Sequence, residues 1–434
     1  MRFCLGLVCG VVVALVSAIS VAQPAADPLR RVQRIVVIFE ENRSFDHLFG
    51  LFPGATGLAN ARDAARQKKP DDTPYDVLPR VLENYPGPAV LDPRFPAGLP
   101  NAPFLIDRFV PINKLTPSPV HEFYREQEQI NGGAMDRFVA ATDSGGLVMG
   151  YHDIRDTNLW RLAREFALAD RMFHSAFGGS FLNHAWLVCS CAFRWPGASP
   201  ELGVTPDGFV VNTARSVQFH KPADTDAAGL VPPQTMPHIG DRMDAAGVSW
   251  AWYAGGFDNA LAGRPEPLFQ FHHQPFAYFS GLAPGTPAQK AHLRDYNDLL
   301  RDIDNNTLPQ VTFYKPVGKF DMHAGYANIT DGDAHLGELV ARLQASPAYE
   351  NMLIIVTFDE NGGFWDHVAP PRRDRFGPGT RVPLIAIGPM VKRGFVDHTP
   401  YDFGSILRTI QTRFGVQPVN DVDAAATPLR GMLQ

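Results

Sequence analysis

The sequence contains little cysteine: four residues in 434, at positions 4, 9, 189 and 191. So few thiols exclude a fold held together by several disulfide bonds. The chain does not need such bonds, because a protein of this length can bury a large apolar core. Only one residue separates Cys189 from Cys191, and this spacing fits either two buried thiols or a strained local bridge.

The sequence also lacks any run of lysine or arginine, and 39 basic against 45 acidic residues give a formal net charge of −6. Nucleic acids and anionic membrane surfaces are bound chiefly by clustered positive charge. The composition therefore argues against both as main partners. We expect that the protein does not insert stably into a membrane and that its substrates are small molecules.

The one strongly apolar run, residues 5–16, is too short to span a membrane. It follows Arg2 and precedes Ser20 and Ala22, which are small residues at the positions that signal peptidase reads. We therefore expect a signal peptide over residues 1–22 and an exported protein, periplasmic or secreted. The alternative is a retained N-terminal anchor.

Short apolar runs of β-type composition alternate along the chain with helical patterns, of which 335–343 and 403–414 are the clearest. Internal repeats and low-complexity linkers are absent. This alternation predicts an α/β fold, a three-layer sandwich with a mainly parallel central sheet. The expected strands are 35–39, 167–173, 248–253, 310–314, 353–358 and 382–387.

Candidate chemistry lies near both ends of the chain, which predicts one domain over residues 23–434 rather than two. Residues of about 70–119 are rich in proline and poor in periodicity, and we interpret them as a loop insertion. Such a loop either shapes the mouth of a pocket or serves as a structural strap.

Acidic and amide side chains follow two of the expected strands. Glu41 and Asn42 come directly after 35–39, and Asp359 and Glu360 follow 353–358. In open α/β sheets, ligands bind beyond the carboxyl ends of the strands. Either pair alone could be an ordinary charged turn, but their repetition favours a shared divalent cation site. Oxygen ligands suit Mg, Ca or Mn, without excluding iron or zinc.

A serine follows two glycines at 178–180, before an apolar helical stretch. At a helix N-terminus, Ser180 would lie where backbone N–H groups favour phosphate, and a bound cation would make its hydroxyl a nucleophile. The alternative is an ordinary N-cap. The serine-hydrolase elbow is absent, because Leu182 stands where its second glycine should be.

Four histidines occur among aromatic, proline or glycine residues: His121, His272, His273 and His323. They would suit a phosphoryl group whose charge shifts in the transition state. Each could equally be a satisfied core or surface histidine. Their spacing matches no zinc motif.

Residues 36–46 and 357–367 together resemble the bacterial phosphoesterase family, which unites acid phosphatases with phospholipases C and belongs to the alkaline phosphatase-like superfamily. The likeness spans roughly residues 34–415. It implies one divalent metal ion held by oxygens of Glu41, Asn42, Asp359, Glu360 and Ser180. It further implies that Ser180 attacks phosphorus and forms a phosphoserine intermediate.

The same resemblance implies roles for the histidines. His121, His323 and one of His272 and His273 look like phosphate-site residues, and one of them would protonate the leaving oxygen. By the same likeness, Asn183 and His184 are expected to bind substrate.

Two features favour the phosphatase branch of this family. Residues 178–184 read GGSFLNH, whereas the phospholipase branch typically has a threonine nucleophile in a GPTDPNR context. The sequence also ends soon after 403–414, without the C-terminal β domains of many large phospholipases C. We therefore expect an exported acid phosphatase acting on small phosphomonoesters. The alternatives are a phospholipase C cleaving phosphatidylcholine-like diesters and, from another class, a secreted metal- or phosphate-binding protein without turnover.

Overall fold

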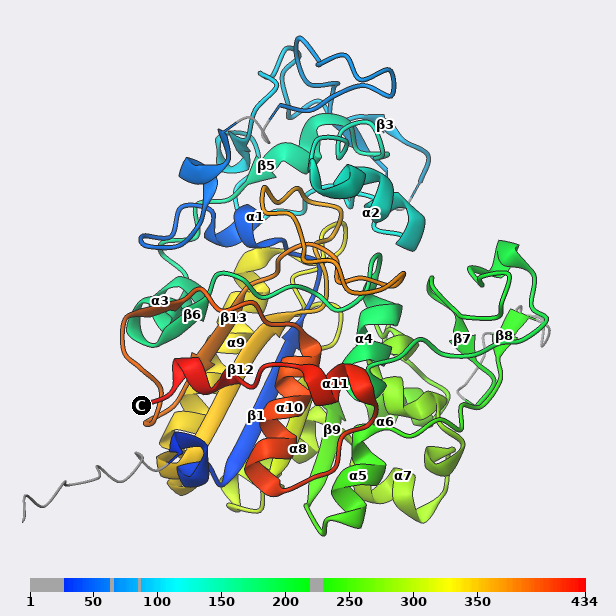
Figure 1. Ribbon diagram of the computed structural model, residues 1–434, viewed down its shortest axis with the longest axis vertical. Coiled ribbons are helices and arrows are strands. Elements are labelled where there is room, and N and C mark those ends of the chain that lie inside the picture. The colour runs from blue at the N-terminus through cyan, green and yellow to red at the C-terminus, as the bar shows by residue number, and fades with distance from the viewer. Residues whose placement is uncertain (1–26, 63–65, 85–86, 219–228) are drawn as a thin grey trace, which may run out of the picture.

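The computed structural model describes residues 27–62, 66–84, 87–218 and 229–434. Its centre is an eight-stranded sheet in the order β10-β9-β11-β1-β12-β13-β6-β14 (Figure 1). β13 is antiparallel to both its neighbours, and every other adjacent pair is parallel. The predicted α/β fold with a mainly parallel sheet is therefore confirmed.

The strands are short apolar runs that are buried on both faces, as expected for a parallel sheet covered by helices. Five of the six predicted strands lie within two residues of their expected bounds. The sixth, predicted over 167–173, forms a regular strand over its first three residues and isolated bridges at Met172 and Phe173. Two small edge strands were not predicted. In sheet order the bounds are β10 (Leu293–Asp295), β9 (Trp250–Ala254), β11 (Val311–Lys315), β1 (Arg34–Glu40), β12 (Met352–Phe358), β13 (Leu384–Ile387), β6 (Ala167–Ala169) and β14 (Phe395–Asp397).

Helices cover both faces of this sheet, which completes three layers (Figure 1). α10 (Phe403–Phe414) packs against α4 (Ser180–Cys189) on one face, and α3 (Asn158–Glu165) packs against α9 (Ile329–Ala345) on the other. α10 has its predicted bounds, and α9 contains the predicted 335–343. The remaining α-helices are α1 (Phe45–Phe49), α2 (Phe123–Ile130), α5 (Ile239–Ala245), α6 (Phe257–Leu261), α7 (Pro287–His292), α8 (Tyr296–Asp304) and α11 (Asp421–Ala425).

The proline-rich segment 70–119 runs through a cap over the carboxyl ends of the strands, at the top of Figure 1. It contributes β2 (Leu82–Glu83), β3 (Val90–Leu91) and β4 (Phe104–Leu105). The cap has a buried apolar cluster of its own, which includes Phe95, Ile106, Phe138, Phe364 and Trp365. Since the last two residues follow β12, this cluster ties the cap to one of the acidic motifs.

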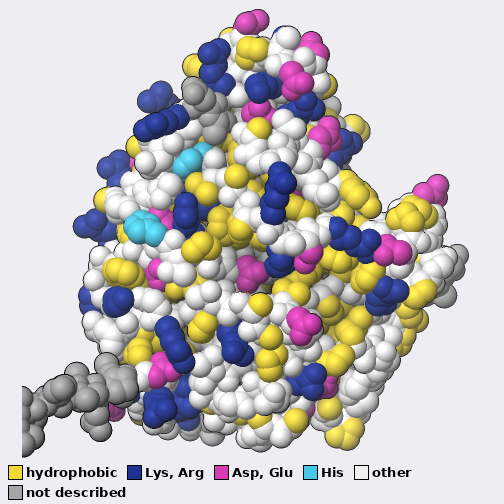
Figure 2. Space-filling view, in the orientation of Figure 1, with side chains coloured by type: hydrophobic (Ala, Val, Ile, Leu, Met, Phe, Trp, Pro, Cys, Tyr) yellow, Lys and Arg dark blue, Asp and Glu magenta, His cyan; other side chains and the backbone are white. Residues whose placement is uncertain are grey.

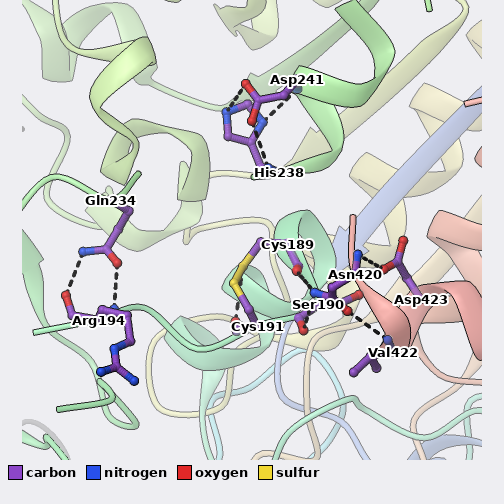
Figure 3. Close-up of a disulfide and its surroundings, with 10 residues drawn as sticks. All are labelled: Cys189, Ser190, Cys191, Arg194, Gln234, His238, Asp241, Asn420, Val422 and Asp423. Carbon is purple, nitrogen blue, oxygen red and sulfur yellow. Dashed lines mark hydrogen bonds and ion pairs between the residues drawn. A yellow bond between two sulfur atoms is a disulfide. The ribbon is translucent and has the colours of Figure 1, made fainter. Parts of the chain in front are cut away.

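Cys189 and Cys191 form a disulfide at the C-terminal end of α4 (Figure 3). Of the two alternatives for these cysteines, the structure therefore contains the bridge. Ser190 between them adopts the left-handed conformation that ends the helix. The Asn420 side chain donates hydrogen bonds to the carbonyls of Cys189 and Ser190, at 2.9 and 3.3 Å, which fixes this end of α4 beside α11.

The predicted signal peptide, residues 1–22, lies outside the described residues. Among the residues that are described, no helix combines the length and apolarity needed to cross a membrane.

A fully buried arginine joins segments that are far apart in the sequence. Arg381 donates to both carboxylate oxygens of Asp366, at 2.8 and 3.0 Å, and to Asp46 Oδ1 at 3.1 Å. Its remaining nitrogen donates to the carbonyls of Thr56 and Asp170, at 2.7 and 2.8 Å. Asp46 and Asp366 belong to the two acidic motifs, so the arginine fastens both motifs to the sheet.

We expect Arg381→Met to lower the free energy of unfolding by about 3–5 kcal/mol, because it leaves two buried carboxylates without their cation. Urea denaturation followed by circular dichroism measures this difference. Arg375→Met is the matched control, since Arg375 pairs with Asp207 at the exposed surface. Equal stability of the two variants would contradict the structural role of Arg381.

Candidate active site

The two acidic pairs meet because β1 and β12 are parallel neighbours in register, with Glu40 opposite Phe358. The residues that follow both strands therefore leave the sheet at the same edge. The backbone N–H of Asn42 donates to Asp359 Oδ1 at 2.9 Å, and all four side chains of the two pairs are buried. The sequence-based expectation that these pairs face one another thus matches their placement.

Ser180 lies directly against the first pair. As the first residue of α4, it donates through Oγ to Glu41 Oε2 at 2.8 Å and lies 3.3 Å from Asn42 Oδ1. The preceding turn requires glycine at position 178, where φ is +88° and a Cβ would lie 2.4 Å from the backbone nitrogen of Phe123. The local sequence therefore places the hydroxyl against two predicted metal ligands.

Asn183 and His184 follow on the same helix. The Asn183 amide holds the turn before Ser180, since it accepts from the N–H of Ala176 and donates to its carbonyl, both at 3.0 Å. His184 is also buried, and its Nδ1 donates to the carbonyl of Ser180 at 2.7 Å. Both side chains thus support the serine from within the protein, and their expected contact with substrate stays a prediction.

The second oxygen of Glu41 faces a group that sequence reasoning missed. Lys315 Nζ lies 2.6 Å from Glu41 Oε1, and His273 Nε2 lies 3.0 Å from the same atom. Burial alone would raise the pKa of Glu41, but its neighbours Lys315 and His273 outweigh it and hold this pKa well below its usual range. The only signal for Lys315 in the sequence was its place at the end of an expected strand.

The predicted phosphate-site histidines surround this centre at different distances. His121 Nε2 lies 3.2 Å from the Asn42 amide nitrogen, and the rings of His121 and His323 are 5.5 Å apart. Of the adjacent pair, His273 contacts Glu41, whereas the His272 ring packs against His273 at 4.7 Å.

Burial lowers the pKa values of several of these imidazoles below their ordinary range. These are His272, His273 and His323, and the pKa of His323 falls to about 3. The Nδ1 atom of His121 donates to the carbonyl of Pro119 at 2.7 Å, which leaves the Nε2 lone pair facing the site. The Nε2 atom of His121 therefore faces the Asn42 amide nitrogen, in a position to accept a hydrogen bond.

Two carboxylate oxygens in this centre indicate that the residues could bind a cation. Asp359 Oδ2 and Glu360 Oε1 are buried, and neither has a hydrogen-bond partner among the described residues. Burial and neighbouring negative charge, from Glu41 on Asp359 and from Asp359 on Glu360, raise the pKa values of both acids well above their usual range. Such an arrangement is costly unless the acids are protonated or share a cation.

The donor set is suited to a hard divalent ion. Oxygens of Glu41, Asn42 and Ser180 lie close to these two carboxylates, each of which has one oxygen without a partner among the described residues. The residues present therefore fit the metal predicted for them.

A second group, formed by Asp46, Asp366 and His367, also has ligand atoms close together. The two carboxylates of this group already pair with the positive charge of Arg381.

A cavity of about 370 Å³ adjoins His121 and Gly179, next to the serine. Its wall includes Asn84 and Ser118 from the proline-rich segment, which bond to each other, with Asn84 Nδ2 donating to the carbonyl of Ser118 at 2.8 Å. Asp143 completes this side of the wall. Of the two roles considered for the segment, these contacts favour shaping the pocket mouth.

Comparison with known proteins finds phospholipases C. The chain is 26% identical to the non-hemolytic phospholipase C of Pseudomonas aeruginosa, over 90% of this chain and 55% of that protein. It is 26% identical to phospholipase C B of Mycobacterium tuberculosis, over 93% and 77% respectively. Non-specific phospholipase C1 of Arabidopsis thaliana is 23% identical, over 89% and 67%. The chain thus spans about half the length of the Pseudomonas protein.

Among solved structures, a phosphonate monoester hydrolase from Silicibacter pomeroyi matches 63% of this chain and 71% of its own, with a TM-score of 0.36 and 14% identity. A protein of the alkaline phosphatase superfamily from Vibrio parahaemolyticus matches 62% of each chain, with a TM-score of 0.34 and 12% identity. The model of the Phosphoesterase family matches residues 32–417, which include every residue of the site described above. The chain belongs to the Phosphoesterase family.

Proposed function

We propose that the protein is an exported, metal-dependent acid phosphatase that hydrolyses phosphomonoesters through a phosphoserine intermediate. One observation carries this proposal: the Ser180 hydroxyl lies 2.8 Å from Glu41, in a buried centre where two carboxylate oxygens have no hydrogen-bond partner among the residues the structure describes. Membership of the family makes phosphoester hydrolysis the class of reaction. Export rests on the signal-like sequence of residues 1–22.

In this proposal Glu41, Asn42, Asp359 and Glu360 hold the ion together with the Ser180 oxygen. When bound, the ion supplies positive charge that lowers the pKa of the serine hydroxyl. Oxygen ligands favour Mg, Ca or Mn for this role.

The two chemical steps then proceed at Ser180. The Ser180 hydroxyl releases its proton to solvent as its Oγ forms a bond to phosphorus, and the ester oxygen leaves with the bonding electron pair and takes up a proton. His121 lies between the metal ligands and the cavity, where it could deliver that proton once it is protonated. Water then attacks the phosphoserine, which releases phosphate and restores the hydroxyl.

Small substrates suit the surroundings of the site. The cavity beside the serine is lined largely by neutral polar and apolar groups, among them Asn84, Phe181 and Asn212. On the face seen in Figure 2, lysine and arginine side chains are spread among acidic and neutral ones. This distribution fits the expectation that nucleic acid is not the substrate.

The second candidate is a phospholipase C, which the three relatives named above favour. Turnover of p-nitrophenyl phosphate and of phosphatidylcholine micelles, each at acidic and neutral pH, separates the two activities. We expect hydrolysis of the monoester, because residues 178–184 read GGSFLNH and lack the threonine context typical of the phospholipase branch. Activity confined to the lipid would make the protein a phospholipase C instead.

A further inference from the structure

The carboxylate of Glu41 faces in two directions. Its Oε2 accepts the hydrogen bond of Ser180, on the side of the proposed metal ligands. Its Oε1 faces Lys315 at 2.6 Å and His273 at 3.0 Å, and His184 Nε2 lies 3.9 Å away. One carboxylate therefore joins two sites of different chemistry.

The Oε1 side has the ligands of a second metal site. One ligand atom each from Glu41, His184 and His273 lie within 4.8 Å of one another, and all three side chains are buried. The Nε2 atom of His184 has no hydrogen-bond partner among the described residues. Two imidazoles and one carboxylate are a donor set typical of zinc.

Lys315 already places a positive charge at this position. It is fully buried at the end of β11, and its Nζ also contacts the carbonyl of Glu40 at 3.3 Å and the face of Phe39 at 5.4 Å. A zinc ion bound to Glu41 Oε1 would lie about 2.0–2.2 Å from that oxygen. Because Nζ lies 2.6 Å from the same oxygen, the ion and the ammonium would compete for one space.

We propose that the ammonium group of Lys315 occupies the position of a second metal ion and so limits the site to one metal ion. The inference rests on the proposed function only for the identity of the first, oxygen-bound ion. Lys315 is here a positioning residue: it holds Glu41 Oε1, so that Oε2 is presented to Ser180.

Zinc stoichiometry tests the proposal. After equilibrium dialysis against excess Zn²⁺, the metal content of each folded variant is measured by mass spectrometry. We expect Lys315→Ala to bind one more zinc ion per chain than the wild type. Lys315→Arg, which keeps the charge, should match the wild type. The double variant Lys315→Ala with His273→Ala should lose the additional ion, because a ligand is missing.

A folded Lys315→Ala protein with the zinc content of the wild type would overturn the proposal. So would an additional ion that persists in the double variant. If Lys315→Ala fails to fold, Lys315→Gln replaces it, because it keeps more of the side-chain volume without the charge. We expect it, too, to bind one additional zinc ion and to lose that ion when combined with His273→Ala. Because the readout is a difference in metal content, it stands apart from hydrolysis: an inactive wild type would count against the proposed function and leave this inference intact.

Discussion

Ser180→Ala should lower kcat/KM for p-nitrophenyl phosphate by a factor on the order of 10³ or more, because it removes the atom that bonds to phosphorus. The Ser180 Oγ contacts Glu41 and Asn42 directly, and Ala would leave both oxygens without that partner. Steady-state kinetics at saturating metal, with circular dichroism to confirm folding, measure the effect.

Ser190→Ala is the matched control. It removes a buried hydroxyl at the other end of the same helix, and that hydroxyl has no hydrogen-bond partner among the described residues. We expect activity within about twofold of the wild type, because Ser190 lies at the C-terminal end of α4 and the proposed nucleophile at its N-terminal end. Full activity in Ser180→Ala would show that another group attacks phosphorus.

Asp359→Asn should weaken metal retention on the order of 100-fold or more, since even indirect partners of a metal ligand change affinity by 10–100-fold. The exchange removes the negative charge of an oxygen that has no hydrogen-bond partner among the described residues and keeps nearly the same volume. Hydrolysis should fall in parallel and recover in part at high metal concentration. Metal content after gel filtration, together with activity against added Mg²⁺, Ca²⁺ and Mn²⁺, measures both effects.

Asp423→Asn serves as the control for this exchange. Asp423 is a buried carboxylate in α11 whose oxygens accept from the backbone N–H groups of Val419 and Asn420, at 2.9 and 2.8 Å. It should retain metal as the wild type does. Unchanged metal content in Asp359→Asn would remove Asp359 from the ligand set.

The meeting of the two acidic pairs could be predicted from local sequence, and the reason is geometric. Each pair directly follows a strand, and the carboxyl ends of parallel neighbours share one edge of the sheet. The helix over 403–414 was also predictable from local sequence. Its cap at Asp402 and the left-handed Gly415 are both local signals.

Other parts of the site depend on the order of the strands in the sheet, which local sequence patterns do not reveal. Lys315 reaches Glu41 only because β11 lies next to β1, although 274 positions separate the two residues. Arg381 joins Asp46 to Asp366 through contacts that the sequence could not reveal. The predicted strand over 167–173 is interrupted: regular pairing with β13 and β14 ends at Ala169, and only isolated bridges follow at Met172 and Phe173.

Trapping of labelled phosphate on Ser180 tests the central claim most directly. The protein is mixed with a ³²P-labelled phosphomonoester, quenched in acid during turnover, digested and mapped by mass spectrometry. Our account predicts label on the peptide that contains Ser180 and none on the same peptide of Ser180→Ala. Rapid hydrolysis with the label on a histidine would contradict the assigned nucleophile, and binding of phosphate without turnover or label would mark the protein as a carrier.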